Sequence, residues 1–495
     1  MLDWTGHALV DVGIAALCAM RDKDNPVQLT FGELDAAAKE MEKYYFGGAL
    51  NSYLTCVFMN SEYVQPGTGR KKDESRRRYA NRILWAHRAE PEPSAKGETC
   101  VFSGLPATHR IHRGQMPLLT GEGVLNFFPA AAGGLFIAGP YLTALQALPL
   151  GGRRSEGKLL IAHSDSPALT LAMASSFVED NRRLLALAMS VGLPNTEGPD
   201  ESLLREQASY DRAKKRPKYP DSKAAFTLIG SDLLGVLRLR RDAQDDHAPT
   251  AGLDVYWLSS SGQGPSLKFF SVPSHLIRFL ALVTRASTST AWERTIMRGW
   301  AGESTKASAS RTGILTGPGR SKNAVLEDLF AIYEYGFIDK PSAHRFVRRH
   351  LFSDLRSNAA SAEDCCWDLT AVFLKEVFLM SPERVQRIRE FADALAAYIE
   401  TRNDSSLYRR LTYAKYFWEF RAGLVKAQRA SVKTDLLFSF EDYLRVFEAE
   451  DSTGVTDWSL VRDLICIRTV EQLYKSGWLT PERVNEEDAE QEQTA

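Results

Sequence analysis

NFFPAAAGGLFIAGPYLTALQALPL, residues 126–150, contains no charged side chain, although a quarter of the whole chain is charged. A membrane span is one explanation for so long an uncharged run. Three prolines in the run argue against it, because each removes a backbone donor and disrupts a lipid-facing helix. Pro140 instead suits the first turn of a helix over residues 141–148. The stretch therefore predicts a buried loop and helix in a soluble domain, followed by a short apolar strand over residues 158–164.

The totals of the sequence favour a soluble protein with more than one domain. With 495 residues the chain exceeds what one hydrophobic core usually supports, which predicts two or three domains. The N-terminus, MLDWTGHALV, lacks the basic flank and apolar core of a signal peptide. Six scattered cysteines without a CxxC spacing favour reduced thiols. We therefore expect a cytoplasmic protein with no membrane partner.

The first part of the chain predicts an α+β fold of mixed helices, short strands and a β-hairpin. Apolar residues at helical spacing indicate a helix around residues 10–17, and Thr30 followed by Glu33 predicts a capping box that opens a second helix. Extended runs at residues 253–258 and 267–272 flank a Ser/Gly-rich turn and predict the hairpin. The expected organisation is an α+β domain over residues 1–301, a flexible linker over 302–323, a helical bundle over 324–485 and an acidic disordered tail over 486–495.

The later part of the chain predicts an all-α helical bundle. Ser381, Pro382 and Glu383 place a cap, a first-turn proline and an acid in the order that begins a helix. Apolar residues at helical spacing predict that each helix buries one face. Two such stripes are Ile388, Phe391, Leu395 and Tyr398, and Leu411, Ala414, Trp418, Ala422 and Val425.

Basic side chains gather in patches although the formal net charge is only −1. The chain as a whole therefore does not attract a polyanion, but each patch is a candidate phosphate-binding surface. For any one patch alone, a solvated surface is the plainer interpretation. The residues are Arg70, Lys71, Lys72, Arg76, Arg77, Arg78, Arg82 and Arg88 in the first patch, Arg212, Lys214, Lys215, Arg216, Lys218 and Lys223 in the second, and Arg402, Arg409, Arg410, Lys415 and Arg421 in the bundle.

The motifs of common enzymes are missing from the sequence. It has no phosphate-binding loop ending in Lys-Ser/Thr, no HExxH and no GxSxG. The alternative enzymatic interpretation is a metal-dependent hydrolase or nuclease, with a transition metal that activates water. Its ligands would be His109, His112, His163 and Asp165, a pattern that also occurs among histidines that bind no metal.

The segment THRIHRGQ, residues 108–115, has the composition of a nucleic-acid contact. Arg110 and Arg113 alternate with histidines and offer cations to phosphates. Gln115 follows them with an amide that can reach a base edge. The segment lies just before the uncharged stretch, which favours a binding role over a plain surface.

Three stretches resemble a known protein family: TGHALVDVGIAAL at residues 5–17, LTCVFMNSEYVQPG at 54–67, and CVFSGLPATHRIHRGQMPLLTGEGVLNFFPAAAGGLFIAGPYLTALQALPLG at 100–151. They are similar to the large subunit of type I-B CRISPR Cascade complexes, the CxxC-CxxC CRISPR-associated family. The resemblance implies a non-catalytic subunit that recognises the target-flanking motif (PAM), helps to unwind target DNA, stabilises the R-loop, and recruits a helicase-nuclease or transposition factors. The implied partners are the crRNA-containing Cascade subunits (backbone, 5′-handle-binding and small subunits), double-stranded target DNA and its displaced single strand.

The resemblance also implies which residues read the flanking motif. The family has an NS-x-x-x-QP segment, which this chain matches at Asn60, Ser61 and Gln65. Amides donate to and accept from base edges, and an aromatic ring can wedge a base step open. The implied PAM-reading residues are Asn60, Ser61, Gln65, Gln115 and Asn126, with Phe127 or Phe128 as a wedge unless these two are buried in the core.

One departure from the family concerns zinc. The family takes its name from paired cysteines that would hold a zinc ion, but here Cys100 is followed at the expected spacing by Ser103. No second pair is present. A thiolate pair cannot form, so we expect no metal and no other cofactor.

Met380 stands directly before the predicted helix start, and from about this residue the bundle resembles the Cascade small subunit. Internal initiation at that codon would yield a small subunit that begins at an element boundary. Mass spectrometry of the products of the expressed gene should then find a C-terminal fragment of about 115 residues, the length from Met380 to the end. If only the full chain is found, the bundle is simply part of the large subunit.

Overall fold

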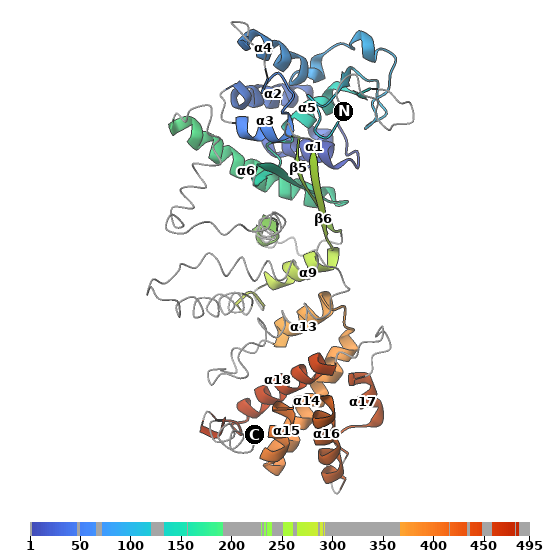
Figure 1. Ribbon diagram of the computed structural model, residues 1–495, viewed down its shortest axis with the longest axis vertical. Helices are drawn as coiled ribbons and strands as arrows, with labels where there is room; N and C mark the ends of the chain where they lie inside the picture. Colours follow the sequence, from blue (N-terminus) through green and yellow to red (C-terminus); the bar gives the residue numbers. More distant parts are fainter. Residues whose placement is uncertain are drawn as a thin grey trace. The chain divides into compact units, whose positions relative to one another are not determined.

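The chain divides into two compact units, Met1–Ala281 and Leu282–Ala495 (Figure 1). The predicted linker at 302–323 and the tail at 486–495 lie outside the described residues. The computed structural model describes residues 2–46, 50–65, 72–119, 133–155, 157–191, 251–260, 265–285, 367–414, 416–432, 436–447 and 458–480, and single positions or short runs within 229–239, 288–292 and 482–484.

Helix α1 (Ala8–Met20) is the centre of the first unit. Every residue from Leu9 to Cys18 is buried, and all are apolar or glycine except Asp11, whose carboxylate accepts from the Thr5 and Gly6 amides. Helices α5 (Gly139–Ala147) and α6 (Pro167–Val191) pack against it. Gly13 makes the contact with α5 close, because a Cβ atom at this position would lie 2.2 Å from the carbonyl oxygen of Ala144.

The described part of the uncharged stretch lies in the core of this unit, as predicted. Its described part, residues 133–150, contains β2 (Leu135–Ile137) and α5, with Pro140 in the first turn of the helix. All of these residues are buried except Phe136 and Pro140, which are half-buried. No helix among the described residues is long and apolar enough to cross a membrane.

The strands form two small antiparallel sheets. β1 (His109–Ile111) pairs with β2, and the larger sheet has the order β3 (Arg153–Ser155), β4 (Lys158–His163), β5 (Leu253–Ser259), β6 (Ser266–Val272). The predicted hairpin is confirmed, with Leu253 opposite Val272 and Leu258 opposite Leu267. Within the described strands β6 is an edge strand, and most of its side chains are exposed. β4 packs against both α1 and α6, so the larger sheet is joined to the helical core.

The remaining elements of the first unit surround this core. Thr30 caps the second helix, with its hydroxyl accepting a hydrogen bond from the Glu33 amide at 3.2 Å, but the Glu33 carboxylate binds Arg21 and Lys23 instead of closing the predicted box. The elements are α2 (Phe31–Phe46), α3 (Asn51–Val57), α4 (Lys72–Ile83) and the short 3-10 helices η1 (Pro26–Gln28), η2 (Ala86–Arg88) and η3 (Pro93–Ala95). Helix α9 (Ser274–Val283) spans the boundary between the two units.

The described part of the second unit is helical, as predicted. Ser381 caps α14 by accepting from the Arg384 amide at 3.2 Å, and Asn403, with a φ of 48°, ends that helix in the left-handed conformation. α14 packs along α18, where buried Arg468 binds Asp393 at 2.7 Å. The helices are α13 (Trp367–Glu376), α14 (Pro382–Arg402), α15 (Ser405–Thr412), α16 (Phe417–Ser431), α17 (Phe440–Phe447) and α18 (Trp458–Lys475).

The second predicted apolar stripe is wrong. A break between α15 and α16 changes the helical phase, so the five residues do not share one face. Leu411 is buried, but Trp418 is 63% exposed and Val425 49% exposed. Helix α16 buries Phe420 and Leu424 instead.

We expect Gly13→Ala to lower the free energy of unfolding by about 2 kcal/mol or more, because the new methyl group must displace the backbone of α5. Gly32→Ala, in the first turn of α2, is the matched control. A Cβ atom there meets only the Thr30 hydroxyl at 3.8 Å, so stability should stay the same or rise by up to about 1 kcal/mol. Urea denaturation of both variants measures the difference, and equal midpoints would contradict the close packing of α1 on α5.

Candidate nucleic-acid interface

The predicted reader segment, residues 60–65, forms a tight turn after α3. The Gln65 amide donates to the Ser61 carbonyl at 2.8 Å, and the Ser61 amide donates to the Phe58 carbonyl at 2.9 Å. Asn60 and Gln65 are exposed at the two ends of this turn, whereas Ser61 is 1% exposed. Two of the three residues therefore present an amide to solvent, and Ser61 does not face a partner.

Three buried tyrosines, one of them in the turn, pack together beneath its surface. Tyr63 lies edge-to-face against Tyr45 of α2 and Tyr79 of α4, with ring centroids 4.8 Å apart in both pairs. The Tyr45 hydroxyl donates to the Gln146 carbonyl of α5, and the Tyr79 hydroxyl donates to the Gly114 carbonyl at 2.9 Å. Burial raises the pKa of all three phenols, so they stay neutral. The turn thus rests on side chains from two helices that do not change charge.

Gln115 lies in this cluster, and its side chain makes hydrogen bonds within the protein. Its side-chain oxygen accepts from the His112 amide at 2.9 Å, and its nitrogen donates to the Tyr79 hydroxyl at 3.2 Å. The neighbouring Gly114 packs so closely that a Cβ atom there would lie 3.2 Å from the Asn60 carbonyl oxygen. The structure therefore brings Gln115 close to the predicted reader, but as a support for the turn. Asn126, Phe127 and Phe128 lie outside the described residues.

The first basic patch is only partly available to phosphates. Arg77 and Arg78 of α4 are exposed, Arg76 is half-buried, and Arg78 pairs loosely with Glu74 at 3.3 Å. Within the described part of the molecule no ion pair is found for Arg77 or for exposed Arg113. Arg70 and Lys71 lie outside the described residues, as do Arg212, Lys214, Lys215, Arg216, Lys218 and Lys223 of the second patch, and the Lys72 side chain is not described.

Three arginines of this region make hydrogen bonds or ion pairs with other residues of the protein. Arg82 binds Glu92 through two nitrogens, at 2.7 and 3.2 Å. Arg88 binds Asp35 through two nitrogens, at 3.0 and 2.8 Å. Arg110 donates to the Gly133 carbonyl at 2.7 Å and lies over the Phe136 ring. Their charges are balanced or directed inward, so Arg77 and Arg113 are the better phosphate contacts.

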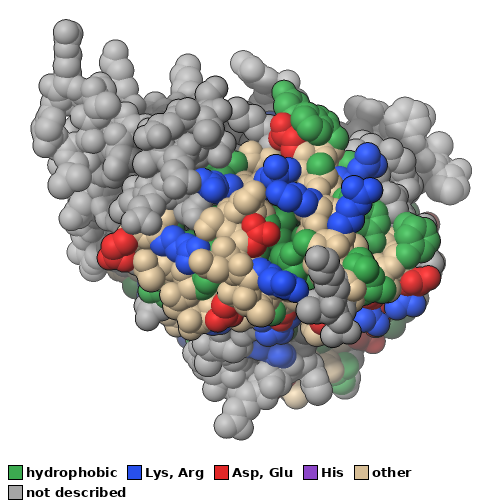
Figure 2. Space-filling view, turned by 90° about the horizontal axis from the view of Figure 1, so that it is seen from below, with side chains coloured by type: hydrophobic (Ala, Val, Ile, Leu, Met, Phe, Trp, Pro, Cys, Tyr) green, Lys and Arg blue, Asp and Glu red, His purple; other side chains and the backbone are tan. Residues whose placement is uncertain are grey.

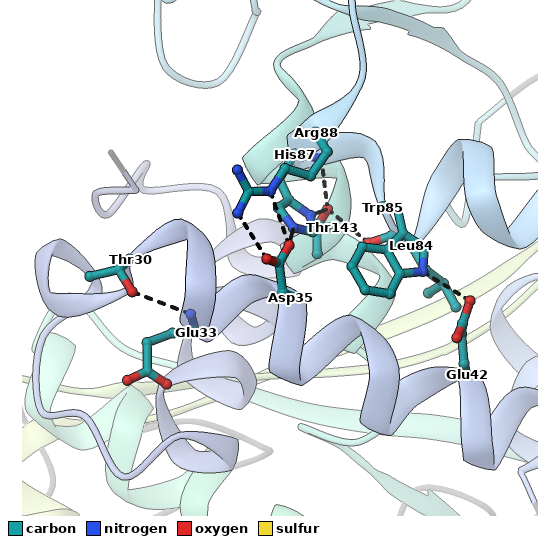
Figure 3. A network of polar contacts seen from close by, with 9 residues as sticks. All are labelled: Thr30, Glu33, Asp35, Glu42, Leu84, Trp85, His87, Arg88 and Thr143. Atoms are coloured by element: carbon teal, nitrogen blue, oxygen red, sulfur yellow. Dashed lines mark hydrogen bonds and ion pairs between the residues drawn. The ribbon is translucent and has the colours of Figure 1, made fainter.

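A polar network that the sequence did not reveal anchors the end of the basic helix α4 (Figure 3). The His87 ring lies between Asp35 of α2, at 2.8 Å, and the Thr143 hydroxyl of α5, at 3.2 Å. Trp85 donates to Glu42 of α2 at 2.9 Å. Arg88 and His87 together lower the pKa of Asp35 to about 2, so that carboxylate is ionised throughout the neutral range. The sequence did carry one signal, because Asp35 and Glu42 lie two turns apart on one face of α2.

The four residues of the enzymatic interpretation do not assemble into one site. Buried His109 contacts the Thr108 hydroxyl at 2.7 Å and lies 3.9 Å from Glu92, while His163 contacts Asp11 of α1 at 3.3 Å. Asp165 is exposed. In the part of the chain that the structure describes, no group of three or more His, Cys, Asp or Glu side chains is placed to hold a metal ion. Among the described residues these side chains therefore do not form a metal site.

The predicted phosphate contacts of the second unit lie on three helices. Arg402 is in the last turn of α14, Arg409 and Arg410 are in α15, and Arg421 is in α16. Arg402, Arg410 and Arg421 are exposed, and Arg409 is half-buried. Lys415 lies outside the described residues.

No family model, curated protein or solved structure matches this chain. The likeness to Cascade large subunits therefore remains a prediction from the motifs quoted above.

The anchor around His87 should make stability depend on pH. Burial lowers the pKa of His87 below its ordinary value, although Asp35 acts in the opposite direction. As the pH falls below about 6.5, the unfolded chain binds a proton at this histidine before the folded chain does, so stability is lost. Urea denaturation between pH 7 and about 5 should show a shallower loss for His87→Gln than for the parent chain. Parallel curves would show that His87 does not contribute.

Proposed function

We propose that this chain is the non-catalytic, DNA-recognising large subunit of a type I CRISPR RNA-guided complex. The proposal is supported by the motif likeness and carried by one structural observation. Two exposed amides, Asn60 and Gln65, stand on a rigid tyrosine base, with exposed Arg77 on the adjoining helix and Arg113 in the adjoining loop.

This arrangement suits a protein that inspects DNA without cutting it. Base pairing with a guide RNA supplies most of the sequence information, so the protein has to read only a short flanking motif. Asn60 and Gln65 donate to and accept from base edges there, while Arg77 and Arg113 hold the adjacent phosphates. The rest of the surface contacts other subunits of the complex and a recruited helicase-nuclease or transposition factor.

Preorganisation is the physical advantage of the tyrosine base. Each base-edge contact discriminates by about 1–3 kcal/mol only when the amide is already held in place. Side chains on a mobile loop would lose part of that free energy when they become ordered. Tyr45 and Tyr79, each hydrogen-bonded to a backbone carbonyl, pack against Tyr63 and so hold the backbone of the turn that carries the two amides.

The test measures binding of the assembled, guide-loaded complex to targets with the correct and the wrong flanking motif. Gln65→Ala and Asn60→Ala should each reduce the ratio of the two affinities about tenfold, because a base-edge contact is lost. Gln386→Ala is the matched control, since Gln386 is an exposed amide on α14, far from the turn in sequence. Arg77→Gln should weaken binding to both targets equally, because a phosphate contact carries no base identity. Unchanged ratios in both amide variants would refute the assignment of the reader.

A further inference from the structure

Two large aromatic rings stand exposed at the start of α16. Tyr416 is 59% exposed and Trp418 is 63% exposed. Their rings are nearly parallel, with an interplanar angle of 8° and centroids 6.4 Å apart. Trp and Tyr are mostly buried or half-buried in proteins, and two nearly parallel exposed rings offer a flat aromatic surface to another molecule.

The rings are carried by a firmly packed helix. Phe417, between them in sequence, lies against Phe447 and Trp458, with centroid distances of 6.2 and 5.4 Å. Further along α16, buried Gly423 lies against α15, and a Cβ atom there would be in ordinary contact with Cβ of Arg410 at 3.5 Å. The helix that carries the two rings is therefore packed against its neighbours within the unit.

The surroundings of the rings are basic. Arg421, Lys426 and Arg429 are exposed on α16, and exposed Arg410 faces the same helix from α15. The single acid of α16, Glu419, accepts a hydrogen bond from the Tyr416 amide at 3.1 Å and so caps the helix start. Seen from below, from the side on which Figure 1 draws α15 and α16, the surface carries more Lys and Arg than Asp and Glu, with apolar side chains between them (Figure 2).

We propose that Tyr416 and Trp418 form a stacking platform for the bases of a single-stranded nucleic acid, whose phosphates contact Arg421, Lys426 and Arg429. Base faces stack on aromatic rings without regard to sequence, and cations beside the rings follow the backbone. The inference rests on the proposed function and names the displaced DNA strand as the occupant. A helical polypeptide is the competing occupant, since Val425 is also exposed on this helix, but the excess of positive charge favours the polyanion.

The test uses the purified full-length chain and fluorescent strands of about 15 nucleotides, a length that spans such a site. One strand is oligothymidylate and the other is an abasic strand of the same length. Trp418→Ala and Tyr416→Ala should weaken binding of oligothymidylate roughly fivefold to a hundredfold, because a stacked base is lost, and leave the abasic strand unaffected. Trp418→Phe keeps a ring and should retain most of the affinity.

Phe440→Ala removes an aromatic side chain that is 70% exposed on α17 and is the matched control, with no expected effect. If Trp418→Ala weakens the binding of both strands equally, or the binding of neither, the stacking platform is refuted. Unchanged DNA binding in both Trp418→Ala and Tyr416→Ala also favours a helical polypeptide as the occupant. Asn60 and Gln65 are not involved in this assay. If the assembled complex does not distinguish the flanking motifs, the proposed function is refuted, but the binding of single strands by Tyr416 and Trp418 is not.

Discussion

The close contact between α1 and α5 is the constraint on which the first unit depends. Gly13 lets the backbone of α5 lie directly against α1 at Ala144. Gly139, at the start of α5, allows a second approach, because a Cβ atom there would lie 2.0 Å from the Ala86 carbonyl oxygen. An uncharged helix enclosed in this way leaves no room for a larger side chain on either side.

The same helix connects the core to the proposed reader through its few polar groups. Thr143 meets His87, which secures the end of α4. The Gln146 carbonyl accepts from Tyr45, and the Gln146 side chain donates to the Gln115 carbonyl at 3.1 Å. The backbone of the reader turn is therefore packed against residues that are bonded to the core, which is one requirement of a preorganised recognition surface.

Local patterns predicted much of the fold, and long-range contacts account for what they missed. The placement of proline and glycine was sufficient to predict the helix that begins near Pro140. Two extended runs on either side of a polar turn were sufficient to predict the β5–β6 hairpin. The stripe through Trp418 failed because a few irregular residues before α16 change its phase, which periodicity alone does not register. Gln115 lies beside the predicted reader, but its hydrogen bond to Tyr79 of α4 joins residues 36 positions apart, and a local sequence pattern does not register such a contact.

Strand β6 has a consequence for self-association of the protein in solution. Leu267 and Phe269 are about half exposed on this edge strand. Unpaired edges with apolar side chains are sites where sheets of separate molecules join and aggregate. Lys268, between these two residues, is exposed, and its ammonium group lies 5.1 Å from the centre of the Trp257 ring. A lysine in the middle of an edge strand opposes such joining, so this one side chain protects the sheet from self-association.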